Sequence, residues 1–142
     1  TDSEYSECLE NFLKDCGSEK DGHYTIDEIP IKQIQIIADP SAASFIQQLY
    51  RDKYRYVIKA NNKVIDGIRA VSSAFHERML FIHKDCHFLL KELTNYVWDE
   101  KAQKKGEDKP IKRDDHAMDA MRYGYFTLRV PRGTGKKILG RR

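Results

Sequence analysis

The stretch Ile34-Gln35-Ile36-Ile37-Ala38-Asp39-Pro40 decides the fold class. Its first five residues are rich in β-branched side chains, which predicts a short buried strand. Pro40 ends that strand, because proline has no backbone N–H to donate to a sheet. Asp39 is then expected at the carboxyl end of a buried strand, where the binding sites of open α/β sheets form. It is a candidate site residue, and an aspartate that only makes the turn is the alternative.

Helical and strand patterns alternate around this stretch. Spacing of apolar residues predicts helices near residues 3–15, 45–49, 65–75, 89–97 and 114–127. Further strands are expected at 54–60 and 80–83, and residues 17–30 and 99–113 fit loops or small hairpins. Thr1 and Glu4 have the spacing of a capping box, and Ser41 or Ser44 can cap the helix near 45–49. Such alternation predicts an α/β fold with a mostly parallel sheet covered by helices.

A second group of candidate residues lies in Asp115-His116-Ala117-Met118-Asp119. On a helix, Asp115 and His116 share one face with Asp119, because residues three and four apart are neighbours there. The two carboxylates repel each other, so a cation is expected nearby. Arg122 or the helix N-terminus is one answer. A divalent metal held jointly with Asp39 is the other, because carboxylate oxygens suit Mg²⁺ or Mn²⁺. Spacing alone leaves both answers open.

Composition limits what the chain can be. It has 142 residues, 40% of them hydrophobic, and a formal net charge of +3, which suits one packed domain with no strong electrostatic preference. No apolar run approaches the roughly 20 residues that span a bilayer, so no membrane segment is expected. No phosphate-binding loop of the Walker type is found. Residues 129–142 carry six basic and no acidic side chains, which indicates either a solvated tail or a contact with nucleic-acid phosphates.

Several short motifs together resemble the C-terminal nuclease domain of tailed-phage or prophage terminase large subunits. The resemblance covers roughly residues 31–126, and its most specific part is Asp115-His116-Ala117-Met118-Asp119-Ala120-Met121-Arg122-Tyr123. The other matching motifs are Ala38-Asp39-Pro40-Ser41-Ala42, Gly67-Ile68-Arg69, Leu80-Phe81-Ile82-His83 and Tyr96-Val97-Trp98.

This resemblance implies a ribonuclease H-like fold, with a mixed sheet flanked by helices, over residues 1–128, followed by the basic tail 129–142. It implies an endonuclease that cuts concatemeric double-stranded viral DNA with two Mg²⁺ or Mn²⁺ ions. Asp39 resembles the second catalytic aspartate, Asp119 the last one and His116 its companion, and Asp115 matches a frequent acidic neighbour. Lys59, Lys63, Lys112 and Arg113 border the expected rim as candidate phosphate contacts.

The resemblance also implies partners and a location. They are an upstream ATPase domain, the portal protein and the terminase small subunit, in the cytoplasm of the bacterial host rather than in the mature virion. The family's first catalytic aspartate lies on a strand that precedes the first helix, whereas this sequence opens at that helix. We therefore expect the opening strands and the motor to be absent from this piece, which leaves its activity in isolation open. The alternatives are a docking module that does not cut, and another ribonuclease H-like nuclease of the resolvase, integrase or transposase type.

Overall fold

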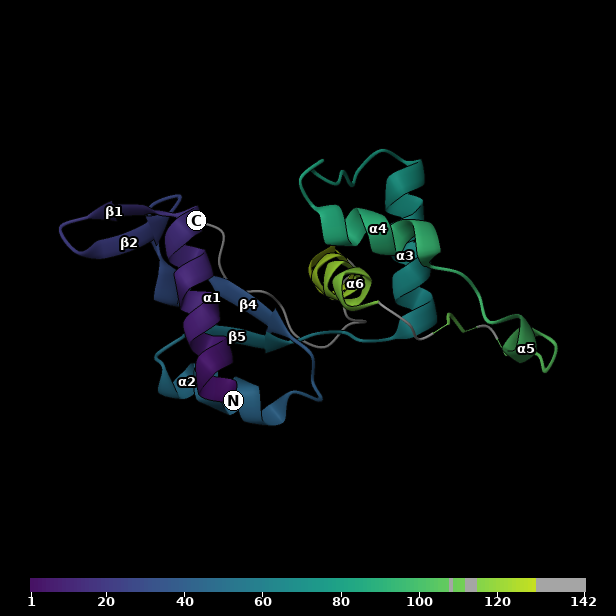
Figure 1. Cartoon of the computed structure of the whole chain (residues 1–142), viewed down its shortest axis with the longest axis horizontal. Coiled ribbons are helices and arrows are strands. Elements are labelled where there is room, and N and C mark those ends of the chain that lie inside the picture. The colour runs from purple at the N-terminus through teal and green to yellow at the C-terminus, as the bar shows by residue number, and fades with distance from the viewer. Residues whose placement is uncertain (108, 112–114, 130–142) are drawn as a thin grey trace. The chain divides into compact units, whose positions relative to one another are not determined.

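The computed structural model describes residues 1–107, 109–111 and 115–129, and the chain divides into two compact units (Figure 1). The first unit is Thr1–Ala60 and the second is Asn61–Arg142. Each unit has its own helices and its own packing, and each is described by itself below. Among the described helices, none is both long enough and apolar enough to cross a membrane.

The first unit contains a small antiparallel sheet and a separate parallel pair of strands. The strands of the antiparallel sheet lie in the order β1-β2-β3, and β4 pairs with β5 in parallel. The strand predicted at 34–38, the one at 54–60, the helix at 3–15 and the hairpin within 17–30 are confirmed. The elements are α1 (Asp2–Cys16), β1 (Ser18–Lys20), β2 (His23–Ile26), β3 (Ile29–Pro30), the 3₁₀ helix η1 (Ile31–Gln33), β4 (Gln35–Ala38), α2 (Ala43–Arg51) and β5 (Tyr56–Lys59).

The ends of α1 are fixed by the residues that the sequence indicates. Thr1 accepts a hydrogen bond from the Glu4 backbone and the Glu4 side chain bonds back, which completes the predicted capping box. Gly17 ends the helix. A Cβ at Gly17 would lie 2.6 Å from the Thr25 carbonyl oxygen, so the glycine allows α1 to end close against β2.

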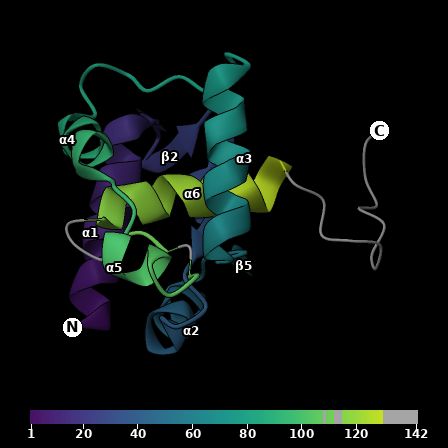
Figure 2. The ribbon, with the colours of Figure 1, turned by 90° about the vertical axis from the view of Figure 1, so that its right-hand side faces the viewer.

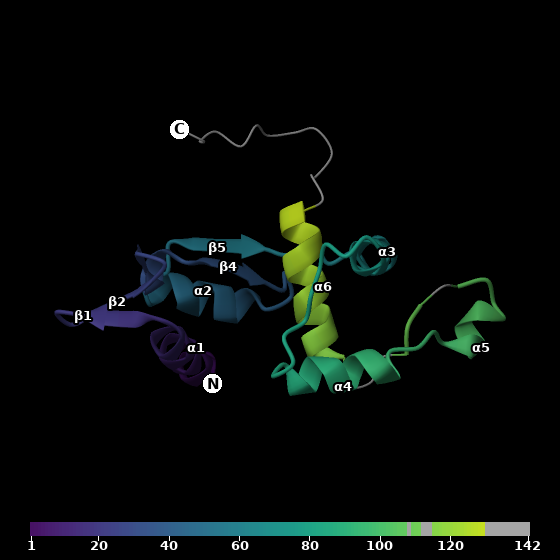
Figure 3. The ribbon, with the colours of Figure 1, turned by 90° about the horizontal axis from the view of Figure 1, so that it is seen from above.

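The core of the first unit lies between α1, α2 and the parallel pair of strands. Leu49 is fully buried, and Tyr54 is 2% exposed. Figure 3 shows α1 and α2 on the same side of β4 and β5. The buried cluster draws side chains from helices and strands alike: Leu13, Ile31, Ala38, Ile46, Leu49, Tyr54 and Val57. Burial against the helices therefore holds a parallel pair that two short strands alone would not keep.

The predicted serine cap of α2 is wrong. The N-cap of α2 is Ala42, which makes no side-chain capping bond. Ser41 instead donates from its backbone N–H and its hydroxyl to Asp39, and Ser44 already lies within the helix. The Asp39 carboxylate lies two residues before Ser41 and accepts both of its hydrogen bonds. These bonds form a turn, so Ser41 does not cap the helix.

The second unit is helical. Its helices are α3 (Val64–His76), α4 (His87–Asn95), α5 (Glu100–Gln103) and α6 (His116–Arg129). Helix α6 packs against both α3 and α4, and Figure 2 shows it crossing α3. The charged stretch predicted at 99–113 is a hairpin-like excursion, in which Trp98 and Pro110 form an antiparallel bridge and α5 lies between them. Residues 108, 112 and 113 of this stretch lie outside the described residues, as does residue 114, where the next helix is predicted to begin.

The strand predicted at Leu80–His83 is wrong, because these residues form no strand. A strand exists only through hydrogen bonds to a neighbouring strand. The described residues of the second unit contain an isolated bridge at Trp98 but no named strand for residues 80–83 to pair with. The fold is mixed α/β, with small sheets flanked by helices, as the resemblance implies. The mostly parallel sheet that the alternation of elements predicts is wrong: among the described residues, the three-stranded sheet is antiparallel and the parallel pairing is confined to β4 and β5.

An ionic network on α1 makes the first unit sensitive to acid. The Glu10 carboxylate accepts from Lys32 of η1 and, at 2.9 Å, from Lys14 of α1. These two bonds, with that to Lys32 the larger cause, lower the pKa of Glu10 from its ordinary value of 4.5. A lowered pKa means that the stabilisation is present above pH 4.5 and is lost as the pH falls through the lower folded value.

We predict that Glu10→Gln makes unfolding less dependent on pH. The wild-type chain should lose more stability than the variant between about pH 5 and pH 3, because only the wild type has this carboxylate to protonate. Urea unfolding followed by circular dichroism at several pH values measures the difference. Glu7→Gln, on the same helix and with the same change in charge, is the matched control. Equal pH dependence of the Glu10 variant and the wild type would contradict the prediction.

Candidate nuclease site

Asp39 lies where the sequence predicts, at the carboxyl end of a parallel strand. Ala38 is the last residue of β4 and pairs with Lys59, the last residue of β5. The Ala60 N–H then donates to the Ala38 carbonyl at 2.8 Å. Asp39 and the exposed Lys59 therefore belong to the same edge of the pair, within the first unit. This edge is the position at which α/β sheets place their binding sites.

The Asp39 carboxylate also has a structural role. Its Oδ1 atom accepts from the Ser41 backbone N–H and from the Ser41 hydroxyl, both at 2.8 Å. These bonds make the turn that leads into α2, so the turn alternative considered for the sequence is present. They also fix the direction of the side chain. A carboxylate has about four lone-pair positions, so a turn role and a ligand role are chemically compatible.

The other three candidate residues lie at the start of α6, in the second unit. Asp115 directly precedes the helix and is buried, His116 is its exposed first residue, and Asp119 lies in its first turn. The Asp115 carbonyl accepts from the Asp119 N–H at 2.8 Å, which begins the helical hydrogen-bonding pattern. The three residues therefore lie within one short segment at the start of α6.

Glu92 of α4 caps this segment. One of its carboxylate oxygens accepts from the backbone N–H groups of Ala117 and Met118, at 2.8 and 2.9 Å. Such N–H groups have no partner inside the helix, and the positive end of the helix dipole favours an acceptor that is negatively charged. Sequence reasoning missed Glu92, because no local pattern connects a residue of α4 with a helix that begins 24 positions later.

Arg122 provides a cation for Asp119. Its Nη2 lies 2.7 Å from Asp119 Oδ1, and the two side chains are only 5% and 16% exposed. Its Nη1 donates to the carbonyls of Asn62 and Lys63, both at 3.1 Å. The ion pair that the sequence offered as one of two explanations is therefore present. A carboxylate has about four lone-pair positions, so this ion pair and a role as a metal ligand are chemically compatible.

Gly67 of α3 makes room for Arg122. A Cβ at this position would lie 2.8 Å from Arg122 Cγ and 2.9 Å from Cδ. Glycine inside a helix costs about 1 kcal/mol relative to alanine, so an interior glycine signals a packing reason. That signal was available in the sequence. The residue that fills the space was not, because 55 positions separate the two.

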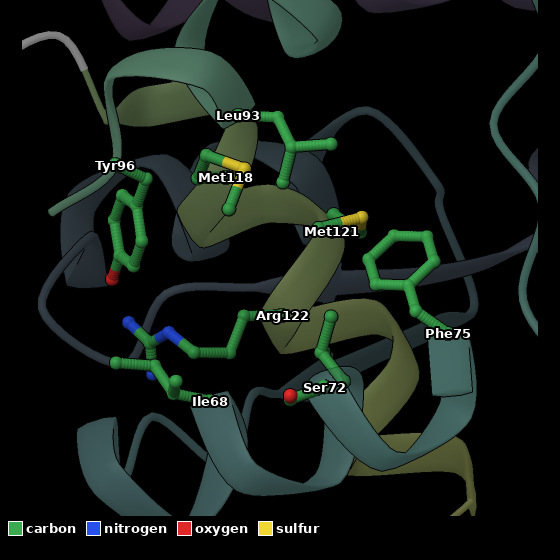
Figure 4. Close-up of a pocket in the computed structure, with 9 residues that line it drawn as sticks. Ile68, Ser72, Phe75, Leu93, Tyr96, Met118, Met121 and Arg122 are labelled. Atoms are coloured by element: carbon green, nitrogen blue, oxygen red, sulfur yellow. The ribbon is translucent and has the colours of Figure 1, made fainter. Parts of the chain in front are cut away.

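An apolar cavity of about 170 Å³ lies beside this ion pair, between α3, α4 and α6. In Figure 4, Arg122 and Tyr96 lie toward one end of it and Phe75 and Met121 toward the other. Burial raises the pKa of the Tyr96 hydroxyl; the positive charge of Arg122 opposes that rise, and the negative charge of Asp119 adds to it. The ion pair is thus set in surroundings of low polarity, which strengthen its electrostatic interactions.

The remaining predicted residues are three basic side chains. Lys63 is exposed at the N-cap of α3 in the second unit, and Lys112 and Arg113 lie outside the described residues. Two carboxylates and an imidazole at the start of α6 are donors of the kind that Mg²⁺ or Mn²⁺ accepts. Within the described ranges, however, no three or more His, Cys, Asp or Glu side chains are grouped to hold a metal ion. The donor types fit a metal, and the start of α6 alone is not a complete site.

We predict that Glu92→Ala destabilises the second unit by about 1–2 kcal/mol, the cost of removing a helix cap. Urea unfolding followed by fluorescence of Trp98, the single tryptophan of the chain, measures it. Lys91→Ala, an exposed change on the same helix, is the control and should alter stability by less than about 0.5 kcal/mol. Equal effects of the two changes would show that the cap contributes nothing.

The chain is similar to known terminase proteins in both sequence and structure. Residues 9–128 match the family model of the terminase RNaseH-like domain. The large terminase subunit of Escherichia phage T5 is 30% identical over 97 residues, which are 66% of this chain and 22% of that protein. A crystal structure of the large terminase from a thermophilic bacteriophage is 44% identical with a TM-score of 0.75, over 90% of this chain and 29% of that one. The complex of that same terminase with ATP-γ-S is 43% identical, with a TM-score of 0.76 over the same shares.

The chain spans less than a third of the length of these relatives. The matches favour terminase over a resolvase, integrase or transposase. Because the family match covers most of the chain and the structural likeness comes with 44% identity, the chain belongs to the terminase RNaseH-like domain family, in the form found in large terminase subunits.

Proposed function

We propose that this domain is a metal-dependent endonuclease that cuts concatemeric double-stranded viral DNA during genome packaging. The observation that carries the proposal is the acidic segment that begins α6. Asp115, His116 and Asp119 follow one another within five residues there, in a domain of the terminase RNaseH-like family. A buried arginine and a capping glutamate hold that segment in place. Such support is what a site needs to keep its ligands in a productive geometry.

The proposed ligands of Mg²⁺ or Mn²⁺ are Asp39, Asp119, Asp115 and His116. Bound divalent ions would supply Lewis-acid stabilisation of the phosphate charge and a water activated at neutral pH. Asp39 belongs to the first unit, and the other three residues belong to the second. The Ser41 bonds to Asp39 and the Arg122 bond to Asp119 orient the two catalytic carboxylates.

His116 and the basic residues have separate proposed roles. His116 is exposed at the start of α6, where an imidazole serves as a metal ligand or as a proton shuttle to the leaving oxygen. Lys59 is exposed at the same strand edge as Asp39, and Lys63 is exposed at the start of α3. We assign these two lysines, with Lys112 and Arg113 on sequence alone, to phosphate contacts. Such contacts give weak sequence preference and strong dependence on salt.

The proposed partners follow from the length of the relatives. They are about three or more times longer than the matched segment, and one of their structures contains ATP-γ-S. We propose that this domain works beside an ATPase domain, with the portal protein and the terminase small subunit as further partners. Packaging would place it in the cytoplasm of a bacterial host during phage or prophage assembly.

We predict that Asp119→Asn abolishes DNA cleavage, with a loss of at least about 100-fold, because the change removes a charged ligand. The assay uses relaxation of supercoiled plasmid with Mn²⁺. It compares the chain alone with a terminase chimera, in which the chain replaces the matching segment of the large terminase from the thermophilic bacteriophage. Asp85→Asn, an identical chemical change at an exposed loop position, is the control and should leave cleavage unchanged.

The outcomes separate the two functions. Cleavage by the terminase chimera that needs Mn²⁺ and Asp119 supports the endonuclease. A chimera that binds DNA but does not cut, while the parent thermophilic-phage terminase cuts under the same conditions, contradicts it and favours the docking module. Full activity of the Asp119→Asn chimera would remove Asp119 from the site.

A further inference from the structure

We propose that Arg122 is a positioning residue for the Asp119 carboxylate and that Gly67 of α3 keeps Arg122 in its place. This inference deepens the proposed function and rests on it, because it assigns Arg122 a role through a residue that we place in the metal site. In this proposal Arg122 orients the Asp119 carboxylate and does not itself bind the metal or the DNA.

The guanidinium of Arg122 is held by three acceptors from two parts of the unit. Nη2 donates to Asp119 at 2.7 Å, and Nη1 donates to the carbonyls of Asn62 and Lys63. A planar, forked donor that is fixed at one end can hold its partner at the other end in a defined direction. The Asn62 and Lys63 carbonyls directly precede α3, so Arg122 ties the first turn of α6 to the start of α3.

A second bond holds the same two segments together. The Asn61 N–H donates to the Thr127 hydroxyl of α6 at 2.9 Å. Arg122 and Thr127 therefore fix α6 against residues 61–63 at two points along the helix. Because these bonds resist rotation of α6, the Arg122 guanidinium keeps its place and holds the Asp119 carboxylate in one direction.

Stability alone is a weak explanation for such a pair. Burying two charges costs solvation free energy that their attraction only about repays, and apolar residues of the same shape often give equal or greater stability. Arg122 is 4% exposed, so it bears that cost. An apolar pair at these positions would not hold a carboxylate in a fixed direction. The ion pair holds Asp119 in one direction, and this is the role that we propose for it.

Gly67 completes the arrangement. Its missing Cβ leaves the space that Arg122 Cγ and Cδ occupy, and the two carbonyl bonds prevent the arginine from moving aside without losing them. Gly67→Ala therefore displaces Arg122 while both members of the ion pair stay chemically intact. Gly124 lies two residues beyond Arg122 on α6, and a Cβ there would meet nothing within 4 Å. Gly124→Ala is thus a matched control, favoured by helix propensity.

The test measures Mn²⁺ affinity by the electron paramagnetic resonance signal of unbound Mn²⁺, without nucleotide, in the terminase chimera. It also measures kcat and KM for plasmid cleavage. Arg122→Lys keeps the charge but cannot reach all three acceptors, so we expect a loss of about 10- to 100-fold in Mn²⁺ affinity and in kcat, the usual effect of losing a residue that orients a metal ligand. KM for DNA should stay within about threefold, since Arg122 is buried and makes no proposed DNA contact. Gly67→Ala should reproduce this pattern, and Gly124→Ala should not.

A double-mutant comparison separates positioning from folding. Every variant is first shown by circular dichroism to be folded at the assay temperature. In a chimera that already carries Asp119→Asn, Arg122→Lys should cause no further loss of Mn²⁺ affinity, because its effect passes through Asp119. Equal losses with and without Asp119, or unchanged affinity and kcat in both Arg122→Lys and Gly67→Ala, would overturn the positioning role.

The same measurements distinguish failure of the proposed nuclease function from failure of the positioning role of Arg122. If Asp119→Asn alone leaves Mn²⁺ affinity and cleavage unchanged, Asp119 is not a ligand, and the positioning inference falls with it. If Asp119→Asn abolishes both while the Arg122 and Gly67 variants behave as wild type, the nuclease proposal stands and only the inference fails.

Discussion

The buried ion pair between Arg122 and Asp119 is the constraint on which the second unit depends. Arg122 is 4% exposed, and the chain supplies acceptors to both of its Nη atoms, from Asp119 and from the two carbonyls that precede α3. The need to fit its aliphatic stem explains the glycine at position 67. The Arg122 guanidinium thus links three features of the unit: the packing of α6 on α3, the direction of Asp119 and the glycine in α3.

A second charge of opposite sign acts at the start of the same helix. Glu92 accepts from two N–H groups of the first turn of α6, so this turn is held by a carboxylate from α4 and by a guanidinium from its own next turn. In the first unit, the candidate carboxylate is instead oriented by a residue close to it in the sequence. Asp39 is oriented by Ser41, two residues later, at the end of a strand that packing against α1 and α2 keeps in place. Two different solutions thus orient the two carboxylates that we place in the nuclease site.

The parts of the structure that local chemistry determines could be predicted from the sequence. The capping box of α1 depends on Thr1 and Glu4 alone, and β4 on a run of β-branched residues. The candidate pair of Arg122 with Asp119 could be proposed from helical spacing. Features that need a partner far along the chain could not. Glu92 and Gly67 act through residues 25 and 55 positions away, and the apolar run at Leu80–His83 lacks a neighbouring strand among the described residues of its unit.

The serine cap of α2 shows a different reason for a wrong prediction. Ser41 has the composition of a cap and lies near a helix start, but Asp39 competes for its donors and forms a turn instead. The competing acceptor is the candidate catalytic residue itself. A local rule therefore fails here at a position with a proposed function, where rules of secondary structure and the needs of a site often conflict.

The central proposal is that Asp39 and Asp119, the two carboxylates that we place in the nuclease site, each bind a divalent metal ion. Anomalous diffraction at the manganese edge, from crystals of the terminase chimera grown with Mn²⁺, tests it directly. The account predicts anomalous peaks about 2 Å from carboxylate oxygens of both Asp39 and Asp119, and their loss in Asp119→Asn. Manganese bound only elsewhere, or bound equally in the variant, would contradict the account.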